Sequence, residues 1–292
     1  MSDLEPFMNL AATLKIAGVL SAVLFHFAME PLRWAVYLDR ENKGAFSSLV
    51  YIFSSTAFFS YVLPAKLGIP LRFWLIKKFQ CVSAAVAGLF MAADSVLAMS
   101  AWALASFALG GNFAVQIILH ILERLRQGVF SWLVVAGLVS IGILIFAWRQ
   151  KWSSLRQRFK VPLNSLGARQ ATAVTVLFAL DITSYVVRHA IILDILSVHN
   201  LGWHTISTLT VISIFAGFVS MMPMGLVGYD ATIIYILTQN GVSVETAAMV
   251  PVINRLANLF VSVVVGIPSA YKLHLGLNLR ELKKKVAAFS NG

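Results

Sequence analysis

Two arginines stand next to breaks in long apolar stretches of this chain. Arg72 follows a break at Pro64, and Arg255 lies beyond a break at Pro223. A guanidinium group stays charged at physiological pH and donates two parallel hydrogen bonds to a phosphate or carboxylate group. Arginines that face a polar cavity therefore suit an anionic headgroup, and we predict that both bind substrate.

Three further residues complete the predicted substrate-binding set: Lys66, Asp230 and Asn254. Other roles stay open. Arg255 can pair with an acid such as Asp230 simply to neutralise charge within the membrane, which is compatible with substrate binding. Arg72 can anchor the chain at the interface, and Lys66 can lie among the headgroups.

The composition places these residues in a membrane. The 292 residues are 59% hydrophobic and 12% charged, and the apolar residues gather in runs of about 20 residues, the length of a membrane-spanning helix. We therefore predict an all-α polytopic protein with a single integral membrane domain over 1–292. The net charge of +11 lies in short loops, where it sets orientation and meets lipid headgroups, so nucleic acid is not an expected partner.

Cofactors and metals are not expected. The lone cysteine, Cys81, excludes an intramolecular disulfide, and the histidines show no metal-ligand spacing.

Two apolar tracts are interrupted by proline and glycine. The first break contains Pro64 and Gly68, and the second contains Pro223, Gly225 and Gly228. Each flanking arm is only about 16 to 18 residues long, short for a full span. Irregular backbone at membrane depth must be buried in protein or line a wet cavity. These residues are therefore predicted to form the tips of two broken or re-entrant helical hairpins.

The chain divides into a first repeat at about 10–109, a connector and span at 110–170, a second repeat at about 171–271 and a basic tail at 272–292. The expected apolar segments are Leu10–Met29, Phe46–Leu63, a short run ending near Lys78, Cys81–Leu109, Phe130–Trp148, Ala171–Leu196, Thr205–Met222, Gly225–Gln239 and Glu245–Tyr271.

The two repeats are expected to have opposite orientations. The most basic loop, 149–169, and the tail are placed in the cytoplasm because lysine and arginine favour that side. Counting crossings from them puts the C-terminus inside and the N-terminus outside. Inverted repeats with broken helices are typical of secondary transporters, which bind substrate where the breaks meet.

Charged residues also occur inside predicted spans. Asp181 and Arg188 are seven positions apart, which places them on nearly the same helix face. We interpret them as a structural pair, with a proton relay as the alternative, and Asp94 as a further buried acid. His26 and Glu30, one turn apart, can titrate together, although a histidine near the headgroups is the commoner case.

The motifs resemble a known family. Pro223 to Asp230, the Gly241-Val242 turn and Arg255 resemble the second signature of the lysylphosphatidylglycerol synthase/flippase transmembrane family. Pro64 to Gly68 with Arg72 resembles its first signature, and Arg33-Trp34 resembles its Arg-Trp pair. The resemblance implies a multi-pass protein of the bacterial inner membrane that transports or handles anionic lipids.

Two departures from the family pattern concern the substrate. An acid usual after the first glycine is replaced by Ile69, and a basic residue usual before the second acid is replaced by Tyr229. The leading hypothesis is a flippase without enzymatic activity. The alternatives are an intramembrane lipid-modifying enzyme or an accessory subunit of a lipid-synthesis complex. Expected partners are membrane lipids, and a homo-oligomer or a complex with lipid-synthesis enzymes stays open.

Overall fold

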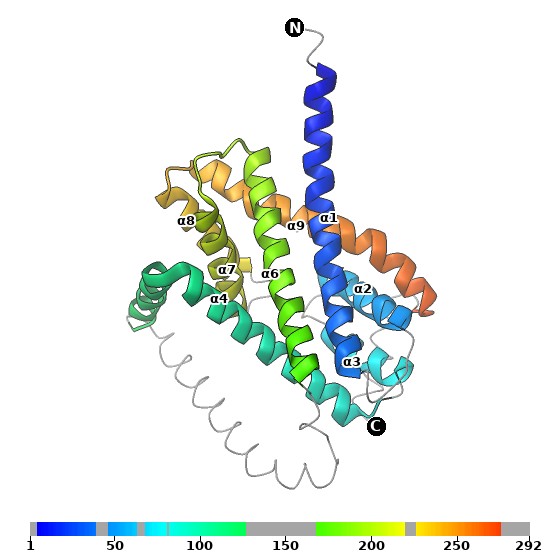
Figure 1. Ribbon diagram of the computed structural model, residues 1–292. Helices are drawn as coiled ribbons and strands as arrows, with labels where there is room; N and C mark the ends of the chain where they lie inside the picture. The colour runs from blue at the N-terminus through cyan, green and yellow to red at the C-terminus, as the bar shows by residue number, and fades with distance from the viewer. Residues whose placement is uncertain are drawn as a thin grey trace.

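The computed structural model describes residues 5–38, 46–62, 68–80, 82–126, 168–219 and 226–275. Within these ranges, every regular element is an α-helix (Figure 1). The helices are α1 (Glu5–Leu38), α2 (Phe46–Val62), α3 (Gly68–Phe79), α4 (Ala84–Arg126), α6 (Ala168–Ile195), α7 (Trp203–Val219), α8 (Leu226–Gln239) and α9 (Val244–Lys272).

Four of these helices are long and apolar enough to cross a membrane. The candidate spans are Leu10–Leu38, Val86–Gly111, Ala168–Ile195 and Val244–Lys272. Large apolar side chains on these spans point away from the protein, since Leu14, Leu104 and Leu256 are 63%, 69% and 59% exposed. In a bilayer, such side chains contact lipid tails rather than water. The chain is a multi-pass membrane protein.

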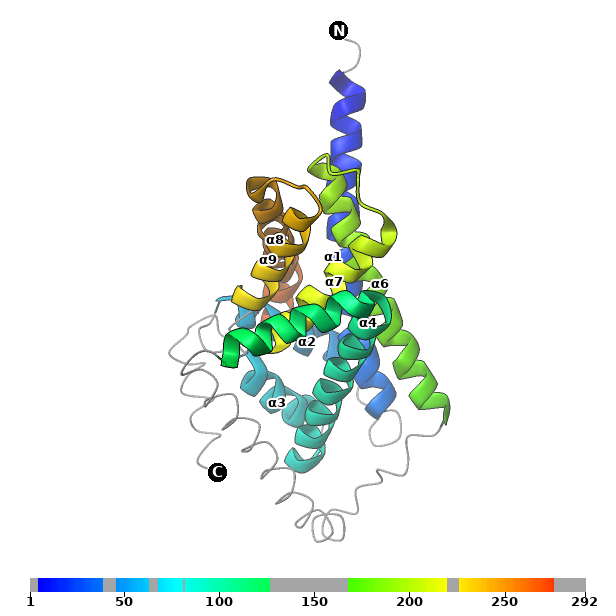
Figure 2. The same cartoon turned by 90° about the vertical axis from the view of Figure 1, so that its left-hand side faces the viewer.

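Helices α1 and α6 lie side by side in opposite directions (Figures 1 and 2). Near the start of α1, Lys15 Nζ lies 2.9 Å from Asp194 Oδ2 at the end of α6. Near the end of α1, the Val36 carbonyl accepts a hydrogen bond from Gln170 at the start of α6. Helices α2, α4, α7 and α9 pack against this antiparallel pair, whereas α3 packs on α2 and α4 and α8 packs on α7 and α9.

The first helix is longer than the sequence predicts. We expected a span at Leu10–Met29 that ends at Pro31, but α1 continues through Pro31 to Leu38. A proline removes one backbone hydrogen bond and normally kinks or ends a helix. Here the following turns bury large side chains, with Trp34 1% and Leu38 2% exposed, and this packing keeps the segment helical.

The long helix α4 has its break close to the expected connector. Its backbone leaves helical geometry at Gly111, where φ is 46° and ψ is −131°. Glycine tolerates this positive φ because it has no Cβ. The connector is expected to open at Gly110–Asn112, and the structure has a kink there between two helical segments, the second of which continues to Arg126.

Helices α2 and α3 pack closely against each other. A Cβ built on Gly68 would overlap the Ser60 side chain and the Thr56 carbonyl of α2. One turn further along α3, Arg72 Nε donates a hydrogen bond to Thr56 Oγ1 at 3.1 Å. The two helices therefore run in opposite directions on either side of 63–67, and Gly68 is required for their close approach.

The join between α8 and α9 has a clear local cause. Gly241 adopts φ 81°, and the amides of Gly241 and Val242 bond to the carbonyls of Thr238 and Leu237. This is the Schellman pattern that ends helices at glycine. Ser243 then caps α9, because its side chain accepts a hydrogen bond from the Thr246 amide. The predicted turn at this point is confirmed.

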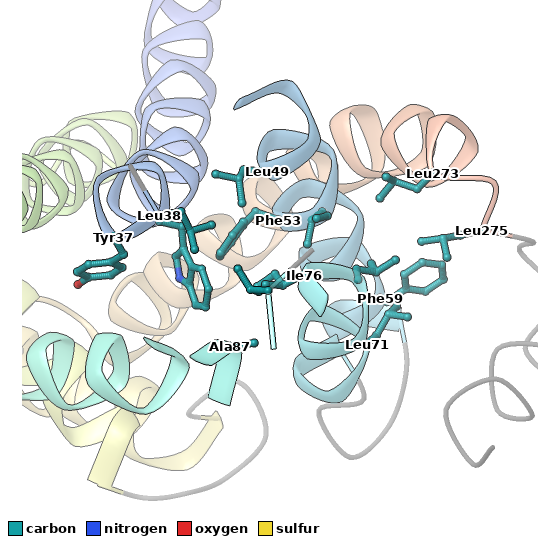
Figure 3. Close-up of a cluster of buried hydrophobic side chains, with 14 of the residues drawn as sticks. Tyr37, Leu38, Leu49, Phe53, Phe59, Leu71, Ile76, Ala87, Leu273 and Leu275 are labelled. Carbon is teal, nitrogen blue, oxygen red and sulfur yellow. The ribbon is translucent and has the colours of Figure 1, made fainter. Parts of the chain in front are cut away.

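Two apolar clusters hold the helices together. One joins the end of α1 with α2, α3, the start of α4, the first part of α6 and the end of α9, as Figure 3 shows for Phe53, Leu71 and Leu273. The other joins the first part of α1 with α4, α6, α7, α8 and α9. The candidate site lies where helices of both clusters meet.

Several predictions fall outside the described residues. They concern the span Phe130–Trp148, the basic loop and the tail, together with Pro64, Lys66, Pro223 and Gly225. Gly228 is described and lies in the first turn of α8.

Candidate functional site

A cavity of about 420 Å³ lies among α1, α2, α3, α6, α7, α8 and α9. Three of the predicted substrate-binding residues line it, namely Arg72, Asn254 and Arg255. Its other polar lining side chains are His26, Glu30, Ser60, Tyr61, Tyr185, Tyr229 and Asn258. The structure therefore brings together arginines that are far apart in the sequence.

Arg72 is held firmly in the wall of this cavity. Its Nη1 and Nη2 atoms each lie 3.2 Å from an oxygen of Glu30 on α1, and its Nε bonds to Thr56 on α2. Its guanidinium also stacks 4.4 Å from the centre of the Phe53 ring. All three nitrogens are engaged, so Arg72 contributes a fixed and largely neutralised charge.

Arg255 pairs with the predicted acid Asp230 of α8. Its Nη2 lies 2.7 Å and 2.9 Å from the two carboxylate oxygens. Its hydrogen bonds to the described residues use Nη2 alone, and its side chain is 22% exposed. Arg255 therefore keeps donors on Nε and Nη1 for a ligand, and charge pairing and ligand binding can coexist on one side chain.

Asn254 belongs to a buried network behind the same wall. Its side chain donates to Tyr229 Oη at 2.7 Å, and Tyr229 Oη lies 2.7 Å from His189 Nε2. The other ring nitrogen of His189 lies within hydrogen-bonding distance of Thr210. This chain of hydrogen bonds links α9, α8, α6 and α7 and holds the side chains of Asn254 and Tyr229 in place. The part of the cavity wall that they form is therefore preformed.

The Asp181–Arg188 pair that the spacing predicts does not form, although both side chains are buried as expected. Asp181 instead contacts Arg33 Nη1 at 3.2 Å and His26 Nδ1 at 2.6 Å. Arg33 Nε also contacts Asp94 at 3.2 Å, and Tyr37 donates to the same carboxylate oxygen. The reason is the antiparallel packing of α1 on α6, which brings Arg33 between the two acids.

Arg188 has no carboxylate partner among the described residues. Its Nη1 donates to Asn258 Oδ1 at 3.2 Å, and its guanidinium lies 4.1 Å from the centre of the Tyr185 ring. Its Nε and Nη2 atoms make no hydrogen bond, although the residue is only 1% exposed. Both Tyr185 and Asn258 line the cavity, so Arg188 lies directly behind its wall.

Sequence reasoning missed part of the site. It kept open that His26 and Glu30 titrate together but favoured a histidine near the headgroups, and it gave no site role to Tyr185 or Asn258, yet all four line the cavity. The spacing of His26 and Glu30 on one face of an apolar helix was the available indication. The sequence around Tyr185 and Asn258 gave no such indication, because their positions at the cavity depend on the packing of α6 against α9.

A second cavity is a poorer candidate for a charged headgroup. It has a volume of about 430 Å³, lies among α1, α4 and α6, and the described residues that line it carry no charge. In the described ranges, no group of three or more His, Cys, Asp or Glu side chains is placed to hold a metal ion.

Comparison with known proteins now adds a family. Residues 2–266 match the family described as Lysylphosphatidylglycerol synthase TM region. The chain belongs to this family. The comparisons give no match among curated proteins and none among solved structures.

Membership of the lysylphosphatidylglycerol synthase TM region family connects this membrane protein with lipid handling. The two positions at which the chain departs from the expected pattern, Ile69 and Tyr229, both line the cavity.

Proposed function

We propose that this chain translocates an anionic lipid across the membrane, with the headgroup in the cavity and the hydrocarbon chains in the bilayer. The observation that carries this proposal is the convergence of Arg72 and Arg255 on one half-open cavity within a bundle of apolar helices. An ionised group at this depth is costly and is typically retained for a function.

The two arginines have different tasks in this proposal. Arg72 is saturated by Glu30 and Thr56, so it forms a fixed, largely neutralised ion pair in the cavity wall. Arg255 offers its free donors to a phosphate oxygen while Asp230 holds the guanidinium in place. Bonds between charged partners of this kind are about twice as strong as neutral ones.

The packing pattern supports an inverted repeat as the mechanical basis. Helix α2 packs on α9, and α7 packs on α4. In an inverted repeat, α1, α2, α3 and α4 would correspond to α6, α7, α8 and α9 in that order. Under this correspondence the α2–α9 contact becomes the α7–α4 contact. The same correspondence relates the α2–α3 contact to the α7–α8 contact. In this proposal α2–α3 and α7–α8 are the two hairpins, and rocking of one repeat against the other alternates access to the cavity.

For topology, we propose the bacterial inner membrane with the C-terminus in the cytoplasm and the N-terminus outside. The support is the distribution of lysine and arginine along the chain. Labelling of single cysteines placed before residue 10 and after residue 275 from each side of the membrane tests this orientation.

The function is tested by headgroup translocation in proteoliposomes that contain fluorescent phosphatidylglycerol. Arg255→Ala is expected to lower the rate at least tenfold, because the free donors are lost. Asp230→Asn is expected to lower it less, because the guanidinium remains but loses its anchor. Arg169→Gln is the control, since Arg169 is exposed at the start of α6.

Unchanged rates in both cavity variants would overturn the site. We propose transport rather than chemistry on the lipid, so a covalently altered lipid formed by the purified protein would overturn the function itself.

A further inference from the structure

We infer that Arg188 is an anion-binding residue that takes two oxygens of one phosphate group through its Nε and Nη2 atoms. This inference deepens the proposed function, on which its lipid assignment rests, by naming the residue that binds the phosphate.

The unused atoms of Arg188 form a matched pair. In a planar guanidinium, Nε–H and one N–H of Nη2 lie on the same edge and point in the same direction. These are the two nitrogens that lack hydrogen bonds, whereas Nη1 is held by Asn258. The edge that binds an oxyanion with two parallel bonds is therefore intact and fixed in orientation.

Burial makes this free edge significant. Arg188 is 1% exposed, and an arginine side chain cannot lose its charge in a protein. Buried donors without partners are rare, because their lost hydration is not replaced. The Tyr185 ring, 4.1 Å from the guanidinium carbon, offsets part of this cost.

The other arginines whose side chains the structure describes differ from Arg188. Arg33, Arg72 and Arg255 each pair with at least one carboxylate within 3.2 Å. Arg169 is exposed. Among the arginines whose side chains the structure describes, Arg188 is therefore the one that is both buried and without an acid, and an anionic ligand would supply the missing charge.

Access to Arg188 runs through the cavity wall. Tyr185 and Asn258 contact Arg188 on one side and line the cavity on the other. The edge is closed to water in this conformation, so a phosphate reaches it only when one of these side chains moves. A headgroup that enters between Arg72 and Arg255 then has a deeper binding partner in Arg188.

The test measures phosphate binding to the purified full-length protein in two arms. One arm titrates inorganic phosphate, and the other titrates short-chain phosphatidylglycerol. Arg188→Lys keeps the charge but loses the two-nitrogen edge, and Arg188→Gln loses both. We expect both variants to weaken binding roughly ten- to hundredfold, the range for a charge-assisted pair of hydrogen bonds. Arg169→Gln should bind as wild type does.

The outcomes separate the Arg188 anion site from the assignment of a lipid as its ligand. Weaker binding in both arms supports Arg188 as the lipid phosphate site. Weaker binding of inorganic phosphate, with no lipid binding by any form, keeps the anion site and overturns the lipid assignment. Wild-type affinity in a folded Arg188→Lys or Arg188→Gln protein overturns the inference, while the translocation assay on Arg255→Ala still judges the proposed function separately.

Discussion

Arg33 and Arg188 are both buried arginines on the antiparallel helices α1 and α6, but their surroundings differ. Arg33 on α1 is 3% exposed, contacts Asp94 and Asp181, and lies 4.3 Å from the centre of the Phe178 ring. Arg188 on α6 is 1% exposed and contacts an aromatic ring and an amide, but no acid among the residues that the structure describes.

The difference separates two uses of a buried charge. In a low-dielectric interior, a charge must be matched by an opposite charge or by several hydrogen bonds. Arg33 meets this requirement within the protein and joins α1, α4 and α6. Arg188 meets this requirement only in part, because its Nε and Nη2 atoms have no hydrogen-bond partner among the described residues and are left for a ligand. Burial of an arginine alone therefore does not indicate its role, whereas the set of acids around it does.

The largest expected effect is on the stability of Arg33→Met. This change leaves Asp94 and Asp181 buried without their shared cation, and the loss of one partner of a buried ion pair costs about 3–5 kcal/mol. The corresponding Arg188→Met removes a cation that is not paired with an acid in the described residues. It strands no carboxylate, so the expected loss of stability is far smaller. Thermal unfolding of both variants in the same detergent measures the difference.

Addition of Asp94→Asn to Arg33→Met serves as the control, because it removes one of the stranded acids and should recover part of the lost stability. Equal destabilisation by Arg33→Met and Arg188→Met would contradict the distinction between the two regions.

The next effect comes from giving Arg188 the acid that it lacks. Asn258→Asp places a carboxylate where Asn258 Oδ1 now lies 3.2 Å from Nη1. The surroundings of Arg188 then resemble those of Arg33. We expect phosphate affinity to fall about tenfold because the new acid neutralises the guanidinium and repels an anion. The same change removes the amide that donates to the Asn254 carbonyl at 2.7 Å, so the new ion pair and this lost hydrogen bond act on thermal stability in opposite directions.

Isothermal titration with phosphate measures this loss of affinity. Asn254→Asp, which places an acid on the same helix at the Tyr229 contact, is the matched comparison. If Asn258→Asp binds phosphate as tightly as wild type does, Arg188 is not the anion site.

The smallest effect is expected for Tyr185→Phe. The ring that covers Arg188 remains, but the hydroxyl that lies 3.0 Å from His26 Nε2 is lost. The loss of one such hydrogen bond costs about 0.5–1.5 kcal/mol, and phosphate affinity should not change. Tyr185→Leu, which also removes the ring, should affect the Arg188 region more. Unfolding and binding measured on both variants separate the hydroxyl from the ring, and equal effects on stability would show that the ring contributes nothing.

Much of the helix arrangement was predictable from local features. Helix α2 ends at Val62 and α3 begins at Gly68, while α7 ends at Val219 and α8 begins at Leu226, so separate helices flank the two stretches of sequence in which proline and glycine disfavour a continuous helix. The turn at Gly241 and the cap at Ser243 also depend on neighbouring residues alone. Arg72, Asn254 and Arg255 could be assigned to one cavity because charges in apolar helices turn inward.

The remaining features depend on contacts between distant segments. Spacing along α6 placed Asp181 and Arg188 on one face but could not reveal that Arg33, from another helix, would take the acid. The continuation of α1 through Pro31 likewise depends on a core that α2, α3 and α4 complete. Periodicity predicts which side of a helix is buried, and the partner on that side depends on the packing of the whole chain.

The most direct test of the lipid assignment is the identity of the lipids that remain bound to the purified protein, measured by mass spectrometry. Wild-type protein should be enriched in phospholipids with an anionic headgroup relative to the membrane from which it is extracted. Folded Arg188→Lys and Arg255→Ala proteins should lose that enrichment. Bound lipid that matches the membrane composition in all three proteins would contradict an anionic headgroup site in this cavity.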